Sequence, residues 1–396
     1  MPLPQKAGFV LLSYVILEIL AFLFLRGGLS YHPIAHGLAD RHRQILKELW
    51  EGERDSYLRP DSDLGWSPRE STTSLNGLYQ NNADGIRSNR EFSPSLSKNK
   101  LRISSYGDSF TYGIEAKLAE TWQSHMEKNH PQIEALNFGV SGYGLDQAYL
   151  RYLKKASKFA SDIVVIGYLS ENINRMVNNF QPFYSPDSGM PLSKPRYFIE
   201  NGKLSLHENP LRSREDYNRL TQDPALVLEP LSRFDYWSKI RPHASTWDFL
   251  PSVRVVKSLS FWFHYQIASD ALIYPNGKYR ESSEAYAITR EVFTAFYEAV
   301  AKNGSIPLIV IYPTARDIEL RKTIGVVTYE PLIQYFHAKG FRFVDLFEGF
   351  ADTNFPIYAQ QHYSARSHGV VARTLWNHLE SEGLLHRPSH YVTDTF

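Results

Sequence analysis

Three turns and one histidine segment in this sequence carry residue types that nucleophilic chemistry uses. The first turn, residues 107–113 (GDSFTYG), directly follows an apolar run of buried-strand length, residues 101–106 (LRISSY). A serine at the end of such a strand, between glycines that permit a tight turn, presents its hydroxyl and its own backbone N–H at the edge of a sheet. The pattern predicts that Ser109 is a nucleophile.

Two further turns follow the next two apolar runs. Residues 137–144 (NFGVSGYG) form a glycine-rich turn that can donate backbone N–H groups toward an oxyanion. Residues 170–175 (SENINR) place an amide side chain, that of Asn172, at the same sheet edge. Taken singly, turn glycines and a capping asparagine have ordinary structural roles.

The histidine segment lies near the C-terminus. Residues 362–369 (HYSARSHG) precede an amphipathic stretch, residues 370–380 (VVARTLWNHLE), which predicts a helix. A histidine in this position can fold back and act as general base for the serine. The order serine, glycine, asparagine, histidine after successive strands favours one shared site over four unrelated turns.

That order resembles the four sequence blocks of the SGNH (GDSL-like) hydrolase superfamily, over roughly residues 100–175 and 300–385. The resemblance implies a three-layer, flavodoxin-like α/β fold and an esterase, lipase or glycan O-acetyltransferase activity. It implies that Ser109 is the nucleophile and His362 the general base. It further implies an oxyanion hole formed by the N–H groups of Ser109 and Gly142 and by the side-chain amide of Asn172.

Two positions depart from the superfamily pattern. Glu171 stands where the third block has a glycine before the asparagine, and Ile173 stands where that block has an acid. The orienting acid of the triad is expected three residues before the histidine, and that position is Ala359. The acid orients and stabilises the histidine without taking its proton, so its loss from this position need not end catalysis.

Three replacements for the missing acid stay open. Asp345 or Asp352 can supply a carboxylate from elsewhere, or a backbone carbonyl can orient the imidazole of a Ser-His dyad. His368 is a second candidate base, but its place just before Gly369 and the closing helix indicates a role at a helix start. We therefore favour His362.

The elements that must position these motifs alternate strand with helix, which indicates a central parallel sheet covered on both faces. Catalytic groups on such a sheet lie at the carboxyl ends of the strands. The expected strands are residues 101–106, 134–138, 162–168, 307–313 and 341–346, and the clearest helices are residues 145–159 and 284–304.

Three segments are expected along the chain: an anchor (1–27), a linker with a helix and a strand-and-turn preamble (28–99), and the hydrolase domain (100–390). Within the linker, residues 39–55 have the pattern of an amphipathic helix. Residues 176–280 are rich in aromatic residues without clear periodicity, and we interpret them as an inserted subdomain that acts as a lid, a substrate-binding surface or a partner contact.

The N-terminal segment predicts a membrane anchor. Residues 7–25 are almost entirely apolar and, at about 1.5 Å of rise per residue, span about 28 Å, close to a bilayer's hydrocarbon core. No small-x-small cleavage site follows Arg26, so we expect a retained inner-membrane helix. The basic residues flanking the helix do not decide its orientation, but a short N-terminal tail commonly stays cytoplasmic, which would put the domain on the extracytoplasmic side. Glu18 inside this helix indicates either contact with another membrane protein or a protonated, snorkelling carboxyl group.

Composition excludes several classes of protein. With 43 basic and 42 acidic residues, the net charge of +1 provides no field to attract nucleic acid. The absence of cysteine excludes thiolate catalysis, disulfides and cysteine-ligated metals. The fourteen histidines show no metal-binding spacing and Asp61-Ser62-Asp63 lies in an ordinary turn, so we expect neither a metal site nor a cofactor.

The sequence therefore predicts a membrane-tethered serine esterase or O-acyl(acetyl)transferase that acts on ester groups of a cell-envelope or exported glycan. Two other functions stay open. One is a lipid-directed lysophospholipase or thioesterase, whose inserted aromatic residues would line an apolar channel. The other is a scaffold of an envelope assembly complex that has lost catalysis, which the absent acid, Glu171 and Glu18 suggest.

Overall fold

The computed structural model describes residues 3–29, 31, 33, 38–51, 57–96, 99–155, 158–186, 188–266 and 277–385. Its centre is a five-stranded sheet in which all neighbouring strands are parallel and run in the order β11-β10-β7-β5-β6. The strands are β5 (Leu101–Tyr106), β6 (Ile133–Asn137), β7 (Ile163–Leu169), β10 (Ile306–Tyr312) and β11 (Phe343–Asp345).

This strand order confirms the predicted flavodoxin-like fold. Counted along the chain, the sheet reads 2-1-3-4-5, and its direction of winding reverses between β5 and β7. Ligands of open α/β sheets bind beyond the carboxyl ends of the strands at this reversal. Ser109 follows β5 and Asn172 follows β7, so two of the predicted site residues flank the reversal.

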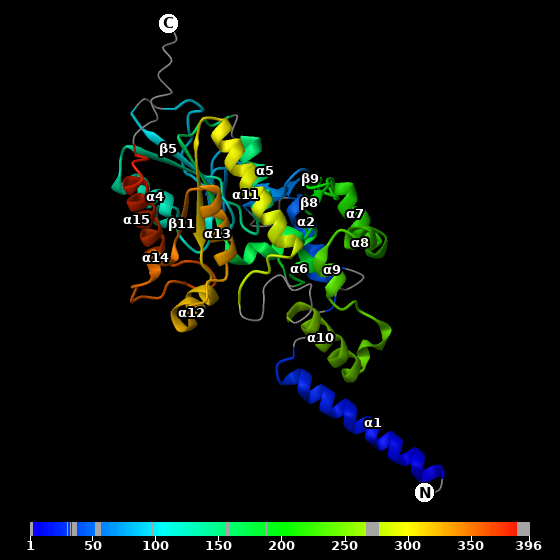
Figure 1. The fold of residues 1–396 in the computed structure, drawn as a ribbon. Helices are drawn as coiled ribbons and strands as arrows, with labels where there is room; N and C mark the ends of the chain where they lie inside the picture. The colour runs from blue at the N-terminus through cyan, green and yellow to red at the C-terminus, as the bar shows by residue number, and fades with distance from the viewer. Residues whose placement is uncertain are drawn as a thin grey trace.

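Two apolar clusters, one on each face of the sheet, make this a three-layer fold (Figure 1). Alternate residues of one strand divide between them: Val164 and Ile166 of β7 belong to one cluster, and Ile163 and Val165 to the other. The first cluster includes residues of α5 (Leu145–Lys155), α11 (Glu284–Lys302) and α13 (Glu330–Lys339). The second includes residues of α4 (Trp122–Asn129), α14 (Phe347–Phe350) and α15 (Ala365–Ser381).

The closing helix α15 begins earlier than the sequence pattern predicted. Ser364 caps it by accepting a hydrogen bond from the backbone N–H of Ser367, so the helix starts at Ala365 and not at Val370. His368 consequently lies inside the helix near its start, on its buried face. The prediction failed because the polar residues before Val370 do not show the apolar periodicity by which the helix was recognised.

The preamble before the sheet consists of a helix and short strand pairs. α2 (Asp40–Glu51) buries Leu46 and Leu49 against the domain, as its amphipathic pattern predicted. It is followed by the antiparallel pairs β1 (Leu58–Asp61) with β2 (Gly65–Pro68), and β3 (Thr72–Thr73) with β4 (Gln80–Asn81). The remaining short elements of the domain are α3 (Ser109–Tyr112), η1 (Leu118–Glu120), η2 (Ser170–Val177) and α12 (Ala315–Ile324).

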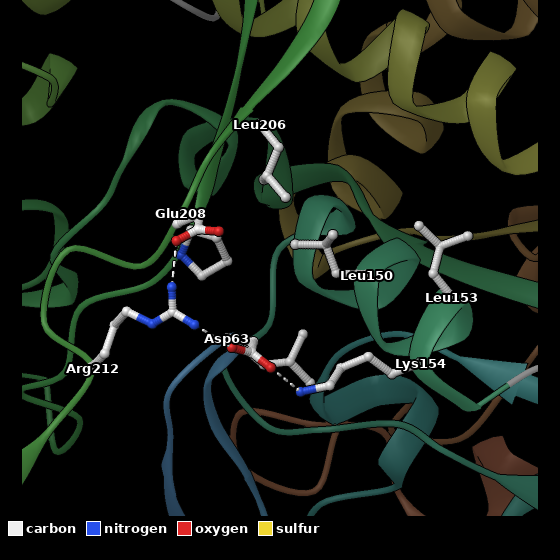
Figure 2. Close-up of a pocket in the computed structure, with 9 residues that line it drawn as sticks. Asp63, Leu150, Leu153, Lys154, Leu206, Glu208 and Arg212 are labelled. Carbon is white, nitrogen blue, oxygen red and sulfur yellow. Dashed lines mark hydrogen bonds and ion pairs between the residues drawn. The ribbon is translucent and has the colours of Figure 1, made fainter.

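Between η2 and α11 the described chain forms a hairpin and several helices. They are α6 (Gln181–Tyr184), β8 (Arg196–Glu200), β9 (Lys203–His207), α7 (Arg214–Gln222), α8 (Pro224–Ser232), α9 (Tyr236–Ile240), η3 (Thr246–Phe249) and α10 (Pro251–Gln266). Next to α5 this segment encloses a cavity of about 310 Å³ (Figure 2). There Asp63 pairs with Lys154 at 2.6 Å and with Arg212 at 2.8 Å, so salt bridges join the insertion, the preamble and α5.

The N-terminal helix α1 (Leu3–Arg26) extends away from the domain (Figure 1). Within the part of the chain that the structure describes, it is the one helix long and apolar enough to cross a membrane, over Lys6–Arg26. Its side chains are almost entirely exposed, which distinguishes it from a core helix. Glu18 accepts hydrogen bonds from Ser252 of α10 in the same chain, a contact that neither sequence interpretation of this residue included.

One buried arginine of the preamble holds the helix that begins with Ser109. Arg87 is 3% exposed and donates to the carbonyl oxygens of Tyr112 at 2.6 Å, Gly113 at 2.5 Å and Ala116 at 2.6 Å. Those carbonyl groups belong to the last residue of α3 and to the turn that follows it. Burial lowers the pKa of Arg87. The preamble therefore fixes the nucleophile turn from behind.

We expect Arg87→Ala to lower the free energy of unfolding by about 3 kcal/mol, because it leaves buried carbonyl groups without donors. Thermal or denaturant unfolding of the purified chain measures this. Arg59→Ala is the matched control: its ion pair with Glu70 is exposed, and we expect a change within about 1 kcal/mol. Equal effects of the two substitutions contradict the assigned role of Arg87.

Candidate active site

Ser109 is the first residue of the short helix α3, directly after the turn that leaves β5. The side chain of Asp108 caps this helix by accepting a hydrogen bond from the N–H of Phe110 at 2.9 Å. The first N–H groups of a helix have no partner within the helix, so the backbone N–H of Ser109 is free of helical bonding. The Ser109 side chain lines a cavity at the carboxyl edge of the sheet.

The second glycine-rich turn packs directly against α3. Asn137 at the end of β6 donates to the carbonyl oxygens of Thr111 at 3.0 Å and Tyr112 at 3.1 Å. Gly139 passes so close to α3 that a side chain there would meet the backbone nitrogen of Tyr112 at 2.4 Å. This contact explains why the turn needs a glycine at that position.

Gly142 lies on the wall of the same cavity as Ser109. Its φ of +81° is in the left-handed region that glycine adopts without strain. The indole nitrogen of Trp66 donates to the carbonyl oxygen of the preceding residue, Ser141, at 2.9 Å. The preamble thus also fixes the turn whose backbone faces the nucleophile.

The third motif begins in η2, directly after β7. Asn172 is 1% exposed, and its amide nitrogen donates to the carboxylate of Asp108 at 2.9 Å. Burial raises the pKa of Asp108, and the nearby Arg175 guanidinium and the Asn172 amide oppose that increase. Asn172 is not among the residues that line the cavity, so the structure holds it beside Ser109, one layer behind the cavity wall.

Glu171, which departs from the superfamily pattern, lies on the cavity wall. It pairs with Arg175 at 2.8 Å, and its side chain is 43% exposed while that of Arg175 is 11% exposed. The substitution therefore adds a salt bridge at the cavity without displacing Asn172. The pocket is more polar than a glycine at this position would make it.

His362 faces the nucleophile turn from the segment before α15. It lines the cavity together with Ser109 and Gly142, and its ring centroid lies 5.1 Å from that of Phe110. Among the described residues no hydrogen bond joins Ser109 to His362. In enzymes without bound substrate such bonds are often long or poorly aligned, so a shared cavity is compatible with a Ser-His pair.

A carboxylate that the sequence patterns did not indicate holds the His362 ring. The Nδ1 atom of His362 lies 3.1 Å from Oε1 of Glu115, six residues after Ser109 in the chain. The same carboxylate accepts backbone N–H bonds from Gln360 at 3.0 Å, Gln361 at 3.2 Å and His362 at 3.3 Å. Glu115 therefore orients both the imidazole and the loop that carries it.

The hydrogen bonds to Glu115 determine its charge state. Burial alone raises the pKa of this carboxyl group, but the His362 ring and the three backbone N–H groups outweigh burial. The net pKa lies below its ordinary value of 4.5. Glu115 is therefore an anion at neutral pH, as a residue that stabilises a histidine cation must be.

The two aspartates suggested from the sequence as replacements for the triad acid do not contact His362 in the described structure. Asp345 accepts from Arg321 at 2.6 Å and Tyr329 at 2.8 Å, and within the described residues it has no contact with His362. Asp352 is exposed and likewise has no recorded contact with the histidine. Neither aspartate is the orienting group in this structure.

His368, the other candidate base, is unsuited to proton transfer. It is 1% exposed, and burial lowers its pKa to about 3, so it stays neutral at physiological pH. Neither of its ring nitrogens has a hydrogen-bond partner among the described residues, and it is absent from the cavity wall. Its position supports the preference for His362.

The cavity that these residues share has a volume of about 560 Å³. Besides the residues already described, polar groups of the loop after β10 and of the segment before α15 line it. The full lining is Ser109, Phe110, Ser141, Gly142, Leu169, Glu171, Arg175, Thr314, Ala315, Arg316, Tyr358, Gln360, Gln361 and His362. Sequence reasoning missed Glu115 and Arg316, because neither belongs to a recognised block.

No family model and no curated protein matches the chain. Among solved structures, a GDSL-like lipase from Bacteroides thetaiotaomicron is similar at 11% identity and a TM-score of 0.35, covering 74% of this chain and 93% of its own. A lipolytic G-D-S-L protein from Veillonella parvula is similar at 11% identity and a TM-score of 0.33, and the match covers 70% of this chain and 97% of that one. An acetyl xylan esterase is similar at 10% identity and a TM-score of 0.33, with 70% of this chain and 98% of that one covered.

The chain's own strand order and the placement of its four motifs define its class. The reversal between β5 and β7, with Ser109 after one strand and Asn172 after the other, is the arrangement that the sequence resemblance implied. The flavodoxin-like fold that the resemblance implied is thus confirmed, and the SGNH chemistry of the site stays a prediction.

The stability that Glu115 provides should depend on pH. Because its pKa is lowered in the folded chain, its contribution is present above the ordinary value of 4.5 and is lost as the pH falls through the folded value. We expect Glu115→Gln to melt at a lower temperature than the wild type at pH 7, and the difference to shrink progressively below pH 4.5.

Glu229→Gln is the control for this measurement. Glu229 is exposed and lies 3.5 Å from Arg233, and we expect its substitution to have little effect at either pH. A melting difference between wild type and Glu115→Gln that does not change with pH would show that the carboxylate's charge is irrelevant to the loop.

Proposed function

We propose that this chain is a membrane-tethered serine esterase or O-acyltransferase that works through an acyl-enzyme on Ser109. The observation that carries the proposal is the convergence of Ser109, Gly142 and a carboxylate-oriented His362 on one cavity. A serine, a base and an orienting acid are the parts of the nucleophilic triad, which is recognised by geometry and not by sequence position.

In the proposed reaction, Oγ of Ser109 attacks the acyl carbonyl carbon while His362 takes the serine proton. The tetrahedral intermediate collapses when the ester's alkoxide leaves with the proton from His362, and the acyl group stays on Ser109. Water, activated by His362, then releases the free acid. A sugar hydroxyl in place of water gives acyl transfer.

The oxyanion of each intermediate would accept hydrogen bonds from the backbone N–H groups of Ser109 and Gly142. Asn172 is the third donor: its amide nitrogen carries two hydrogens, one of which is bound to Asp108. Because Asn172 lies behind the cavity wall, its side chain would have to turn toward the cavity before its second hydrogen reached the oxyanion. Removing one such donor typically costs about 100- to 1000-fold in rate.

Glu115 takes the role of the missing triad acid. It would hold His362 in the tautomer that presents Nε2 to Ser109 and stabilise the imidazolium that forms during attack. Its contact with Nδ1 supports this role over a dyad that relies on a backbone carbonyl. It also removes the main reason for interpreting the chain as a scaffold without catalysis.

The lining of the cavity favours a polar substrate. Three charged side chains and two glutamines share the cavity wall with Phe110, Leu169 and Tyr358, and none of the described lining residues comes from the aromatic insertion. A lipid-directed enzyme would need an apolar acyl channel, which these side chains do not provide. We therefore favour a small acyl group, such as acetyl, on a glycan of the cell envelope.

The tether is the apolar helix Lys6–Arg26. We propose that it is retained in the inner membrane and leaves the catalytic domain on the extracytoplasmic side, where acylated envelope or exported glycans occur. Its side chains are exposed along its length, as lipid contact requires, and Arg26 at its end suits a membrane interface.

A fluorophosphonate probe tests the catalytic proposal. We expect it to label the wild-type chain and not Ser109→Ala. We expect His362→Ala to lose activity on a short p-nitrophenyl ester, and Glu115→Gln to lose about 100- to 10,000-fold in kcat with little change in KM, because the acid acts through the histidine. Glu229→Gln is the control with an exposed carboxylate. Absence of labelling in folded wild type overturns the proposal.

Ester chain length tests the substrate class. We expect acetyl esters to be hydrolysed with a higher kcat/KM than long-chain acyl esters, because charged and amide side chains interrupt the apolar part of the cavity wall. Hydrolysis of a series of p-nitrophenyl esters measures the ratio. A preference for long acyl chains would instead favour the lysophospholipase or thioesterase function.

A further inference from the structure

Helix α10 carries an apolar face that nothing in the described structure covers. Val256 is 66% exposed, Leu259 45%, Trp262 51% and Phe263 51%. Val256, Leu259 and Phe263 are spaced three and four residues apart, so they lie on one side of the helix. Exposed large apolar side chains on one helix face mark a contact surface.

The other side of α10 faces the domain. Ser258 is 4% exposed, and the ring of Phe261 packs against the main core, with the Arg241 guanidinium 5.4 Å from the ring centroid. The helix is therefore fixed to the domain in a single orientation. The apolar face is therefore exposed although the helix is packed against the domain on its other side.

The exposed face continues the contact between α10 and α1. Ser252, four residues before Val256, donates its backbone N–H to Glu18 at 3.0 Å and its hydroxyl at 2.5 Å. Glu18 lies about eight residues before Arg26, which corresponds to about 12 Å of helix. The start of α10 thus packs beside the C-terminal part of α1, about two turns before the helix ends (Figure 1).

The residues around α10 match the chemistry of a membrane surface. In η3, just before α10, Trp247 is 63% and Phe249 70% exposed, which adds to the aromatic side chains at the same place. Across η3 and α10, the two basic residues Arg254 and Lys257 exceed the single carboxylate of Asp248, so the element keeps a net positive charge that suits anionic lipid headgroups. Tryptophan and basic residues together are typical of the lipid interface.

A second contact fixes η3 to the segment that follows α1. The hydroxyl of Tyr31 donates to Asp248 at 2.6 Å, and Lys257 of α10 pairs with the same carboxylate at 2.6 Å. The anchor, η3 and α10 are therefore connected at two places along α1 and its continuation. A membrane that contains α1 must then meet α10 as well.

We propose that α10 and η3 form an interfacial element that lies in the lipid interface beside α1 and holds the catalytic domain against the membrane. The occupant of the exposed face is the bilayer itself. This inference rests on the membrane tether proposed above, and it adds that the domain is docked on the lipid and does not swing freely at the end of α1.

The natural absence of cysteine allows a direct test with the full chain. Leu259→Cys and Phe263→Cys are labelled with a nitroxide in vesicles of phosphatidylethanolamine and phosphatidylglycerol, and collision rates with oxygen and a water-soluble nickel complex are measured. Leu153→Cys on α5 is the control, since its exposure of 45% equals that of Leu259. Leu12→Cys in α1, 58% exposed, reports on the anchor.

We expect the ratio of oxygen to nickel collisions at the two α10 positions to be several-fold higher than at Leu153→Cys and to approach that at Leu12→Cys. Melting temperatures near that of the wild type show that the variants fold. A low ratio on α10 with a high ratio on α1 overturns the docking proposal and leaves the anchor standing.

Two further outcomes also overturn the proposal. Protection of the α10 labels from both collision partners means that a protein, such as a second copy of the chain, covers the face. A low ratio at Leu12→Cys as well means that the anchor itself is wrong, and the interfacial element is then wrong with it.

Discussion

The buried carboxylate of Asp108 is the constraint on which the candidate site depends. It lies in the turn that follows β5, caps the helix of Ser109 and accepts a hydrogen bond from Asn172. Leaving water costs this group free energy, which its raised pKa reflects, and the Arg175 guanidinium and the hydrogen bonds offset part of that cost. Because one carboxylate joins the first and third motifs, Ser109 and Asn172 keep a fixed spatial relation.

The positions of the central strands could be predicted closely from the sequence. β5 covers the predicted residues, and β6, β7 and β10 differ from prediction by one residue at each end. Strands that are buried on both faces appear as continuous apolar runs, so their signal is strong. The predicted start of α15 was wrong, because the helix begins at a serine cap and not where the apolar periodicity begins.

Glu115 could not be predicted from the sequence for a physical reason. Its contact with His362 spans 247 positions of the chain, and neither local pattern nor spacing encodes such a pairing. Its backbone has φ of +68°, a conformation unusual for a glutamate, which turns the chain toward the histidine loop. The superfamily pattern directed attention to Ala359, whereas the carboxylate here comes from the segment after the nucleophile.

The aromatic residues of the insertion can now be divided by what they contact. Phe180, Phe183 and Trp237 are buried and attach the insertion to the main core, while Trp247 and Phe263 are exposed around α10. None of the five lines the cavity of Ser109. A lid or an acyl channel would require aromatic side chains at that cavity. Their actual distribution suits a connector between the domain of the central sheet and α1, so the cavity of Ser109 and the apolar surface of α10 serve different contacts.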